Sequence, residues 1–171
     1  MKKTRLFGML ALAVALVFGV ASCAQDSKPS GQDVADALKD GDDLSGTWKL
    51  TDAYAYVWSD SNVPLFSYEA EYEGPEKVAK SGMLPFELDS NLSFTLTKEN
   101  QKENLERISK MLEATEKEAE EVDDGDFDGY FIVNNDLDEV YFYMYMSGSE
   151  SEFGIEVSME QEIDLTFTKQ K

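Results

Sequence analysis

Hydrophobic and polar residues alternate along most of the chain, which is the period-two pattern of strands that bury one face. Turn-rich pieces such as SDSN, LDSN and SGSES separate the runs, and Pro85 marks its run as an edge strand or a bulge. The apolar positions of successive runs are Trp48, Leu50, Tyr54, Tyr56 and Trp58; Phe66, Tyr68, Ala70 and Tyr72; Leu84, Phe86 and Leu88; Leu92, Phe94 and Leu96; Phe153, Ile155, Val157 and Met159; and Ile163, Leu165 and Phe167. With residues 140–146, they predict a mainly β domain, a single antiparallel sheet of about eight strands.

One stretch, about residues 98–122, breaks this alternation. Its apolar residues recur at steps of three and four, which places them in one stripe along a helix. The stripe consists of Leu105, Ile108, Leu112, Thr115, Ala119 and Val122. We therefore predict one long amphipathic helix, inserted between the fourth and fifth strands and packed over one face or end of the sheet.

The sequence VYFYMYM, residues 140–146, is apolar or aromatic on both faces of a strand. Tyr141, Tyr143 and Tyr145 occupy one face, opposite a face of Val, Phe and Met side chains. One interpretation is a central strand that is covered on both sides. The other is a tyrosine ladder exposed as ligand-binding or partner-binding residues, because aromatic rings with polar tips suit recognition surfaces.

The chain begins with a positive segment, followed by an apolar run from Leu6 to Val20. This run is too short and too early for a lasting membrane span, and it predicts a secretory signal. The run ends in Val20-Ala21-Ser22-Cys23, which resembles the lipobox of bacterial lipoproteins. The resemblance implies cleavage after residue 22, diacylglyceryl transfer to the Cys23 thiol and acylation of the new amine. Ala24 after the cysteine implies sorting to the outer membrane.

The predicted domain organisation follows from this signal. Residues 1–22 form the cleaved signal peptide, and residues 23–43 form the lipidated cysteine and a flexible tether rich in small and polar residues. Residues 44–171 form one β domain, a length that suits a single core. Cys23 is the only cysteine, so a structural disulfide within the chain is excluded.

The charge of the chain excludes several functions. The signal carries three of the 15 Lys and Arg residues, so 12 remain against 35 Asp and Glu, a net charge near −23 after cleavage. Such a charge repels nucleic acid and favours cationic partners. The absence of histidine removes Ser-His-Asp and Cys-His arrangements and His-ligated zinc. We predict that the protein is not an enzyme, since no pair of carboxylates stands out among so many acids.

An acidic stretch after the predicted helix contains the pattern D-x-D-x-D-G of calcium loops. Position twelve, where a bidentate glutamate is expected, is Asn135, and a strand rather than a helix follows. The hypothesis is a helix–loop–strand calcium site in place of a true EF-hand; the alternative is a run of solvated acids at a frayed helix end. The ligands of this hypothetical Ca2+ site are Asp124, Asp126, Asp128, the carbonyl of Tyr130 and Asp136.

The predicted domain opens with Leu44-Ser45-Gly46-Thr47-Trp48. A Gly-x-Trp at the first strand resembles lipocalin-like bacterial lipoproteins, whose β-barrels enclose a ligand cavity. The inserted helix departs from the usual barrel, where the helix follows the last strand, so a curved sheet or a sandwich is an equal alternative. The predicted function is non-catalytic binding of a small apolar ligand or a protein partner by a membrane-anchored envelope lipoprotein. The alternative is a structural or interaction lipoprotein with a calcium-stabilised loop and no ligand cavity.

Overall fold

The structure is a computed structural model that describes residues 28–64, 67–85, 87–152 and 154–171. The signal peptide and Cys23 lie outside the described residues, as do Phe66, Phe86 and Phe153. Within the described part, the chain forms seven strands and three helices. They are β1 (Gln32–Asp33), α2 (Val34–Asp40), β2 (Gly46–Ser61), β3 (Tyr68–Glu73), α3 (Pro75–Ser81), β4 (Ser93–Leu96), α4 (Gln101–Ala119), β5 (Asp123–Val133), β6 (Glu139–Glu152) and β7 (Ile155–Lys169).

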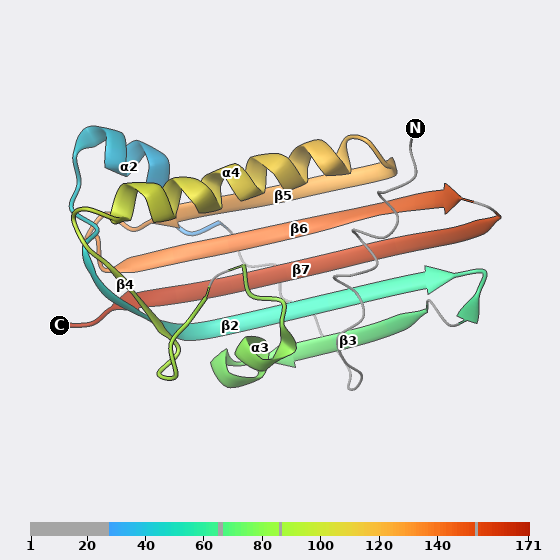
Figure 1. The fold of residues 1–171 in the computed structure, drawn as a ribbon, viewed down its shortest axis with the longest axis horizontal. Helices are drawn as coiled ribbons and strands as arrows, with labels where there is room; N and C mark the ends of the chain where they lie inside the picture. The colour runs from blue at the N-terminus through green and yellow to red at the C-terminus, as the bar shows by residue number, and fades with distance from the viewer. Residues whose placement is uncertain (1–27, 65–66, 86, 153) are drawn as a thin grey trace.

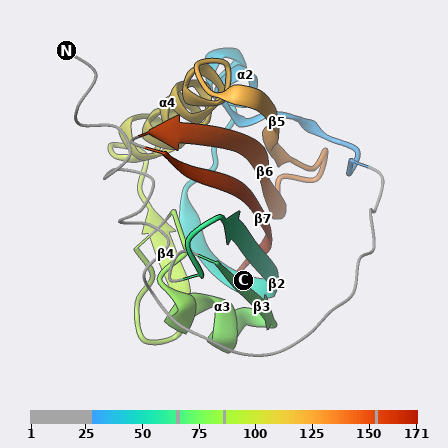
Figure 2. The same ribbon diagram turned by 90° about the vertical axis from the view of Figure 1, so that its right-hand side faces the viewer.

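All seven strands belong to one antiparallel sheet with the order β1-β5-β6-β7-β2-β3, and β4 pairs with the first part of β2. The sheet curves like an open C, with α4 on its concave side (Figures 1 and 2). It begins at β1 and ends at β3, so it does not close into a barrel. The prediction of a single, mainly antiparallel β domain with one long inserted helix is confirmed, and the curved sheet is the alternative that the structure supports.

Helix α4 covers the concave face, which we call the inner face, over β5 and β6 (Figure 1). Val122 lies beyond the end of the helix, but the rest of the predicted stripe is confirmed by the burial of Leu105, Ile108 and Leu112. They belong to one core with Phe131 of β5 and Phe142 of β6. This apolar stripe anchors the helix, since burying each such side chain stabilises a fold by about 1.5–3 kcal/mol.

The structure differs from the predicted strands in two places. Residues 155–169 form the single strand β7 instead of two strands, because Gln161 occupies a buried inward position that interrupts the apolar pattern without interrupting the ladder. Leu84 and Leu88 pack against the core from a segment that is not a strand in its described part, and Pro85 lies between them. Proline cannot donate to a ladder hydrogen bond.

The prediction of a flexible tether through residue 43 is also wrong. Gln32 and Asp33 pair with the end of β5, and the Asp33 carboxylate caps α2 by accepting a hydrogen bond of 2.7 Å from the Ala35 amide. Val34 and Ala37 are completely buried in the core. This segment has few apolar residues, but both of these face the same side of one helical turn. Two buried contacts and a strand pair are enough to join it to the domain.

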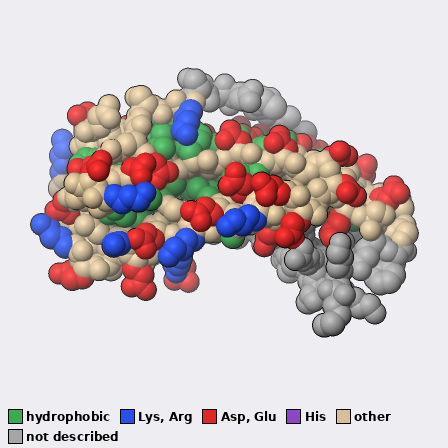
Figure 3. Space-filling model, turned by 90° about the horizontal axis from the view of Figure 1, so that it is seen from above, with side chains coloured by type: hydrophobic (Ala, Val, Ile, Leu, Met, Phe, Trp, Pro, Cys, Tyr) green, Lys and Arg blue, Asp and Glu red, His purple; other side chains and the backbone are tan. Residues whose placement is uncertain are grey.

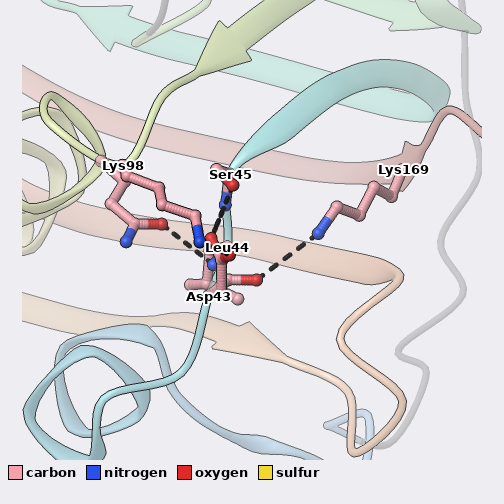
Figure 4. A network of polar contacts seen from close by, with 6 residues as sticks. Asp43, Leu44, Ser45, Lys98 and Lys169 are labelled. Carbon is pink, nitrogen blue, oxygen red and sulfur yellow. Dashed lines mark hydrogen bonds and ion pairs between the residues drawn. The ribbon is translucent and has the colours of Figure 1, made fainter.

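A polar junction holds the segment between α2 and β2 in place (Figure 4). The Asp43 carboxylate accepts a hydrogen bond of 2.6 Å from the Ser45 hydroxyl and forms an ion pair of 3.1 Å with Lys98. The hydrogen bond from Ser45, followed by the contact with Lys98, lowers the pKa of Asp43 to about 2. Lys169, at the end of β7, donates to the Asp43 carbonyl oxygen at 3.5 Å. The junction therefore connects the start of β2 to residues far along the chain.

Next to this junction, the tryptophan of the Gly-x-Trp sequence is part of the core. Trp48 is completely buried, and its indole nitrogen donates a hydrogen bond of 2.9 Å to the carbonyl oxygen of Leu44. The amide of Leu44 donates in turn to the Gln101 side chain at 2.9 Å, at the first residue of α4. Trp48 thus links β2 to the start of the helix.

Replacing Val34 with alanine tests whether α2 belongs to the domain. We expect Val34→Ala to lower the free energy of unfolding by about 2 kcal/mol, because it removes two buried methyl groups and leaves a cavity. Asp36→Ala is the matched control in the same helix, since it breaks an exposed pair with Lys39 that contributes at most about 1 kcal/mol. Urea denaturation measures both variants, and equal stability for Val34→Ala and the wild type would contradict the packing of α2.

Candidate functional site

The convex side of the sheet, opposite α4, carries columns of aromatic and acidic side chains. Residues that pair directly across an antiparallel ladder lie on the same face. Tyr143 of β6 pairs with Asp164 of β7, which pairs with Tyr54 of β2. We define the acidic aromatic face by three adjacent columns: Tyr141, Tyr143 and Tyr145 on β6; Glu160, Glu162 and Asp164 on β7; and Tyr54, Tyr56 and Trp58 on β2.

The nine side chains of this face are half-buried, whereas the inward-facing Val140, Phe142 and Met144 of β6 are buried. Phe142 is completely buried and Met144 is 7% exposed. Helix α4 thus covers only the inner side of β6. The interpretation in which this helix helps to cover both sides of the strand is therefore wrong. The structure places the three predicted tyrosines together on the side that faces away from α4.

Contacts between neighbouring side chains order the β6 edge of the face. Tyr130 of β5 stacks on Tyr143, with ring centroids 5.2 Å apart and planes 21° apart. Tyr143 also hydrogen bonds to the Glu162 carboxylate, and the Tyr141 hydroxyl donates to Glu139 at 2.6 Å. Such aromatic pairs contribute about 0.5–1.5 kcal/mol beyond their buried area. The rings are therefore held in a defined arrangement.

The phenols of this face remain protonated over the physiological range. Burial, followed by the negative charges of Asp164 and Asp128, raises the pKa of Tyr130 to about 12. The hydrogen bond to Glu139, with burial, raises the pKa of Tyr141 to about 12. Burial and the Glu162 charge raise the pKa of Tyr143 as well. These hydroxyls act as hydrogen-bond donors and not as nucleophiles.

Glu162 lies at the centre of the face between Tyr145 and Tyr56. Burial raises the pKa of its carboxyl above the usual value, the hydrogen bond from Tyr143 opposes this shift, and the charge of Glu160 adds to it. An anionic group is thus held where a carboxylate is less well solvated than in water. A cation placed beside the Glu162 carboxylate would lower the electrostatic cost of this poor solvation.

One cation does contact this side of the molecule. The ammonium group of Lys28 lies 5.0 Å from the ring centroid of Tyr130, within the range of cation–π attraction. Tyr130 is the ring that stacks on Tyr143. The aromatic rings on this side are therefore able to receive an ammonium group.

The hypothetical calcium ligands are not brought together. Asp126 and Asp128 lie within strand β5 and pair with Ser147 and Tyr145, so the predicted loop is part of a strand. Asp136 lies in the turn beyond the other end of β5, about 20 Å along the strand from Asp126. Among the described residues, no group of three or more acidic side chains is arranged to hold a metal ion.

Gly129 has a packing role in place of the sharp turn expected from the calcium pattern. A Cβ atom there would lie 2.7 Å from the ring of Phe127 and 3.3 Å from a methyl group of Leu112 in α4. At Gly125, a Cβ atom would lie 1.8 Å from the carbonyl oxygen of Ala119. Both glycines face the helix and let β5 approach it closely. Residues 125–133 do alternate inward and outward, and this signal was hidden because glycine occupies two of the inward positions.

Charge divides the molecule into two ends. Lysine and arginine side chains gather over the half that contains α2 and the beginning of α4, while the half where β6 and β7 turn shows acidic side chains (Figure 3). The sequence explains this division, because no Lys or Arg occurs between Lys117 and Lys169. The acidic aromatic face lies on strands that belong mostly to this stretch.

A hollow of about 460 Å³ lies elsewhere in the molecule, between α2, α4 and the edge of β5. Its wall includes Glu113 and Glu116 of α4 and the ion pair between Asp36 and Lys39, in which nitrogen and oxygen are 2.7 Å apart. The charged groups of this wall are exposed to solvent. The acidic aromatic face is the better candidate, because its side chains are half-buried and mutually ordered.

Comparisons of the chain with protein-family models, with curated protein sequences and with solved structures found no match. Across the residues that the structure describes, none of the helices combines the length and apolar character needed to cross a membrane.

Replacing Glu162 with glutamine tests the electrostatics of this face. The raised pKa means that the folded state holds this proton more tightly than the unfolded state, whose ordinary pKa is 4.5. The stabilising contribution of Glu162 is thus fully present below pH 4.5 and is lost as the pH rises through the folded pKa. We expect the stability of Glu162→Gln relative to the wild type to grow across this window, as measured by urea denaturation from pH 4 to pH 8.

Glu113→Gln, on an exposed surface of α4, is the matched control for this charge change. It reports the general effect of removing one negative charge from an acidic protein. A stability gain for Glu162→Gln that is equal to that of Glu113→Gln at every pH would contradict the burial of Glu162.

Proposed function

We propose that this protein is a lipid-anchored lipoprotein of the bacterial envelope, most consistent with the outer membrane, that binds a partner without converting it. The anchor rests on the sequence Val20-Ala21-Ser22-Cys23 at the end of an apolar signal. Several acyl chains hold a protein on a membrane more firmly than one, at about 0.8 kcal/mol per buried methylene. The domain is then fixed close to a membrane surface, where it can present a binding surface.

The observation that carries the binding role is the acidic aromatic face. Nine half-buried side chains form three adjacent columns on the side of the sheet that does not pack against α4. A strand needs only one apolar face to join a core, so the aromatic side chains of β6 and β2 exceed what folding requires. Tyrosine and tryptophan combine apolar area with a hydrogen-bonding tip and are enriched at recognition surfaces.

The arrangement favours a macromolecular partner over a small apolar ligand in a barrel. The sheet is open, and α4 fills the inner face of β5 and β6 with Leu105, Ile108 and Leu112. The acidic aromatic face is a broad surface that extends over three strands. The phenols of Tyr141 and Tyr143 are protonated and can donate hydrogen bonds to a partner.

Changing Cys23 to alanine tests the anchor. We expect the wild-type protein, expressed in a bacterial host, to incorporate a labelled fatty acid and to fractionate with membranes. Cys23→Ala should incorporate no label and keep its signal peptide, because the thiol that accepts the lipid is absent. Mass spectrometry of the purified proteins measures both changes. Wild-type protein that is exported, cleaved and free of acyl chains would refute the proposed anchor.

Native mass spectrometry of envelope-purified protein tests the binding role. We expect the wild type to retain a bound component and Tyr143→Ser to lose it, because Tyr143 connects Tyr130 to Glu162 on the acidic aromatic face. Ser109→Ala, on the helix, is the control and should retain the component. Equal retention by Tyr143→Ser and the wild type, with both proteins folded by circular dichroism, would place the binding surface elsewhere.

A further inference from the structure

We propose that the acidic aromatic face binds an extended polypeptide segment that carries lysine or arginine at alternate positions. This inference rests on the proposed binding function and names the chemistry of its partner. It follows from the charge of the face, from the spacing of its columns and from the contact that Lys28 makes.

The charge of the face excludes anionic partners. Strands β3, β5 and β6 contain no Lys or Arg, and β2 and β7 contain only Lys49 and Lys169, both near one end of the sheet. Glu69, Glu71 and Glu73 of β3 lie beside the aromatic column of β2, opposite Trp58, Tyr56 and Tyr54. The β2 column therefore lies between two acidic strands, and the β6 column lies between the acidic column of β7 and a β5 strand that contributes Asp128. A cationic segment is the complement of this pattern.

The spacing of the carboxylates matches an extended chain. Glu160, Glu162 and Asp164 are every second residue of β7, so they are about 6.5–7 Å apart. Side chains on one face of an extended peptide repeat at the same distance. A peptide that lies along β7 can thus place a cation beside each carboxylate without bending. The side chains on one face of a helix repeat about every 5.4 Å, which is shorter than this spacing, so a helix loses register over several positions.

The aromatic columns add a second attraction to each of these positions. Directly paired residues on neighbouring strands have their Cβ atoms about 4.5–5.5 Å apart, so a cation beside Glu162 also reaches the rings of Tyr145 and Tyr56. A cation within about 6 Å of a ring centroid is attracted by the ring face. The sites at Glu162 and Asp164 therefore combine one carboxylate with two rings, and the site at Glu160 combines one carboxylate with the ring of Trp58.

Lys28 shows this kind of contact within the molecule itself. Its ammonium group lies 5.0 Å from the centroid of the Tyr130 ring, which stacks on Tyr143 of the β6 column. The contact involves a ring at the edge of the face and not the carboxylate column of β7. It shows that a lysine side chain on this side of the sheet lies over an aromatic ring.

The test compares two synthetic peptides of equal composition, measured against the full mature protein in detergent. One peptide alternates lysine and serine, and the other has the same lysines in one block followed by the serines. We expect tighter binding of the alternating peptide by isothermal titration calorimetry, with affinity falling as salt is added. Equal affinity for the two peptides would overturn the match in spacing and indicate only general attraction to an acidic protein.

The double variant Glu162→Gln plus Asp164→Asn tests the location of the site. It should bind the alternating peptide about tenfold more weakly, the size expected from losing charge-assisted contacts of about 1.4 kcal/mol in total. The matched control is Glu113→Gln plus Glu116→Gln on α4, which changes the net charge equally and should reduce affinity by less than about twofold. Equal losses in the two double variants would overturn the proposal.

Nuclear magnetic resonance on the wild type keeps the test independent of how the variants fold. Tyrosine ring and β7 amide signals should shift when the alternating peptide is added, while signals of α4 stay in place. Shifts confined to α4 would refute the proposed site.

The two proposals can fail separately. If the peptide fails to bind but Tyr143→Ser still loses the component retained from the envelope, the proposal of a cationic partner is wrong and the proposed binding function stands. If both experiments fail, both proposals fall.

Discussion

The packing of α4 against the inner face of the sheet determines the rest of the structure. Leu105, Ile108 and Leu112 pack into one core with Phe131 and Phe142, and the helix approaches β5 closely because Gly125 and Gly129 lack side chains. A single helix covers one face of a sheet and leaves the other to solvent or to a partner. Because side chains alternate along each strand, this contact also fixes which residues of β2, β6 and β7 point outward.

The outward residues are unusual for a face that only meets solvent. Charged and small polar side chains would be sufficient there, yet β6 and β2 present large rings. The Glu162 carboxylate between these rings is held at some electrostatic cost, as its raised pKa indicates. Perturbed groups of this kind gather at functional sites more often than elsewhere. A cationic partner would reduce this cost, because its positive charge would lie beside the Glu162 carboxylate.

The sequence predicted the fold class, the long helix and its buried stripe, because these depend on periodicity over many residues. It also placed Tyr141, Tyr143 and Tyr145 on one face of a strand, which the structure shows. It did not predict β5, since inward glycines conceal the alternation and the acidic outward residues resemble a calcium loop. The pairing of β6 with β7 and β2, which places the tyrosine column beside Glu162 and Tyr56, depends on long-range register that periodicity does not contain.

Hydroxyl-radical footprinting can show whether the outward side of the sheet is a binding surface, because it reports the solvent access of individual side chains. The account predicts that Tyr143, Tyr145 and Tyr56 react in the purified protein and become protected when the protein is intact in the bacterial envelope. Phe142, which is completely buried, should stay unreactive in both states. Tyrosines that react equally in both states, or that are as unreactive as Phe142 in the purified protein, would contradict the account.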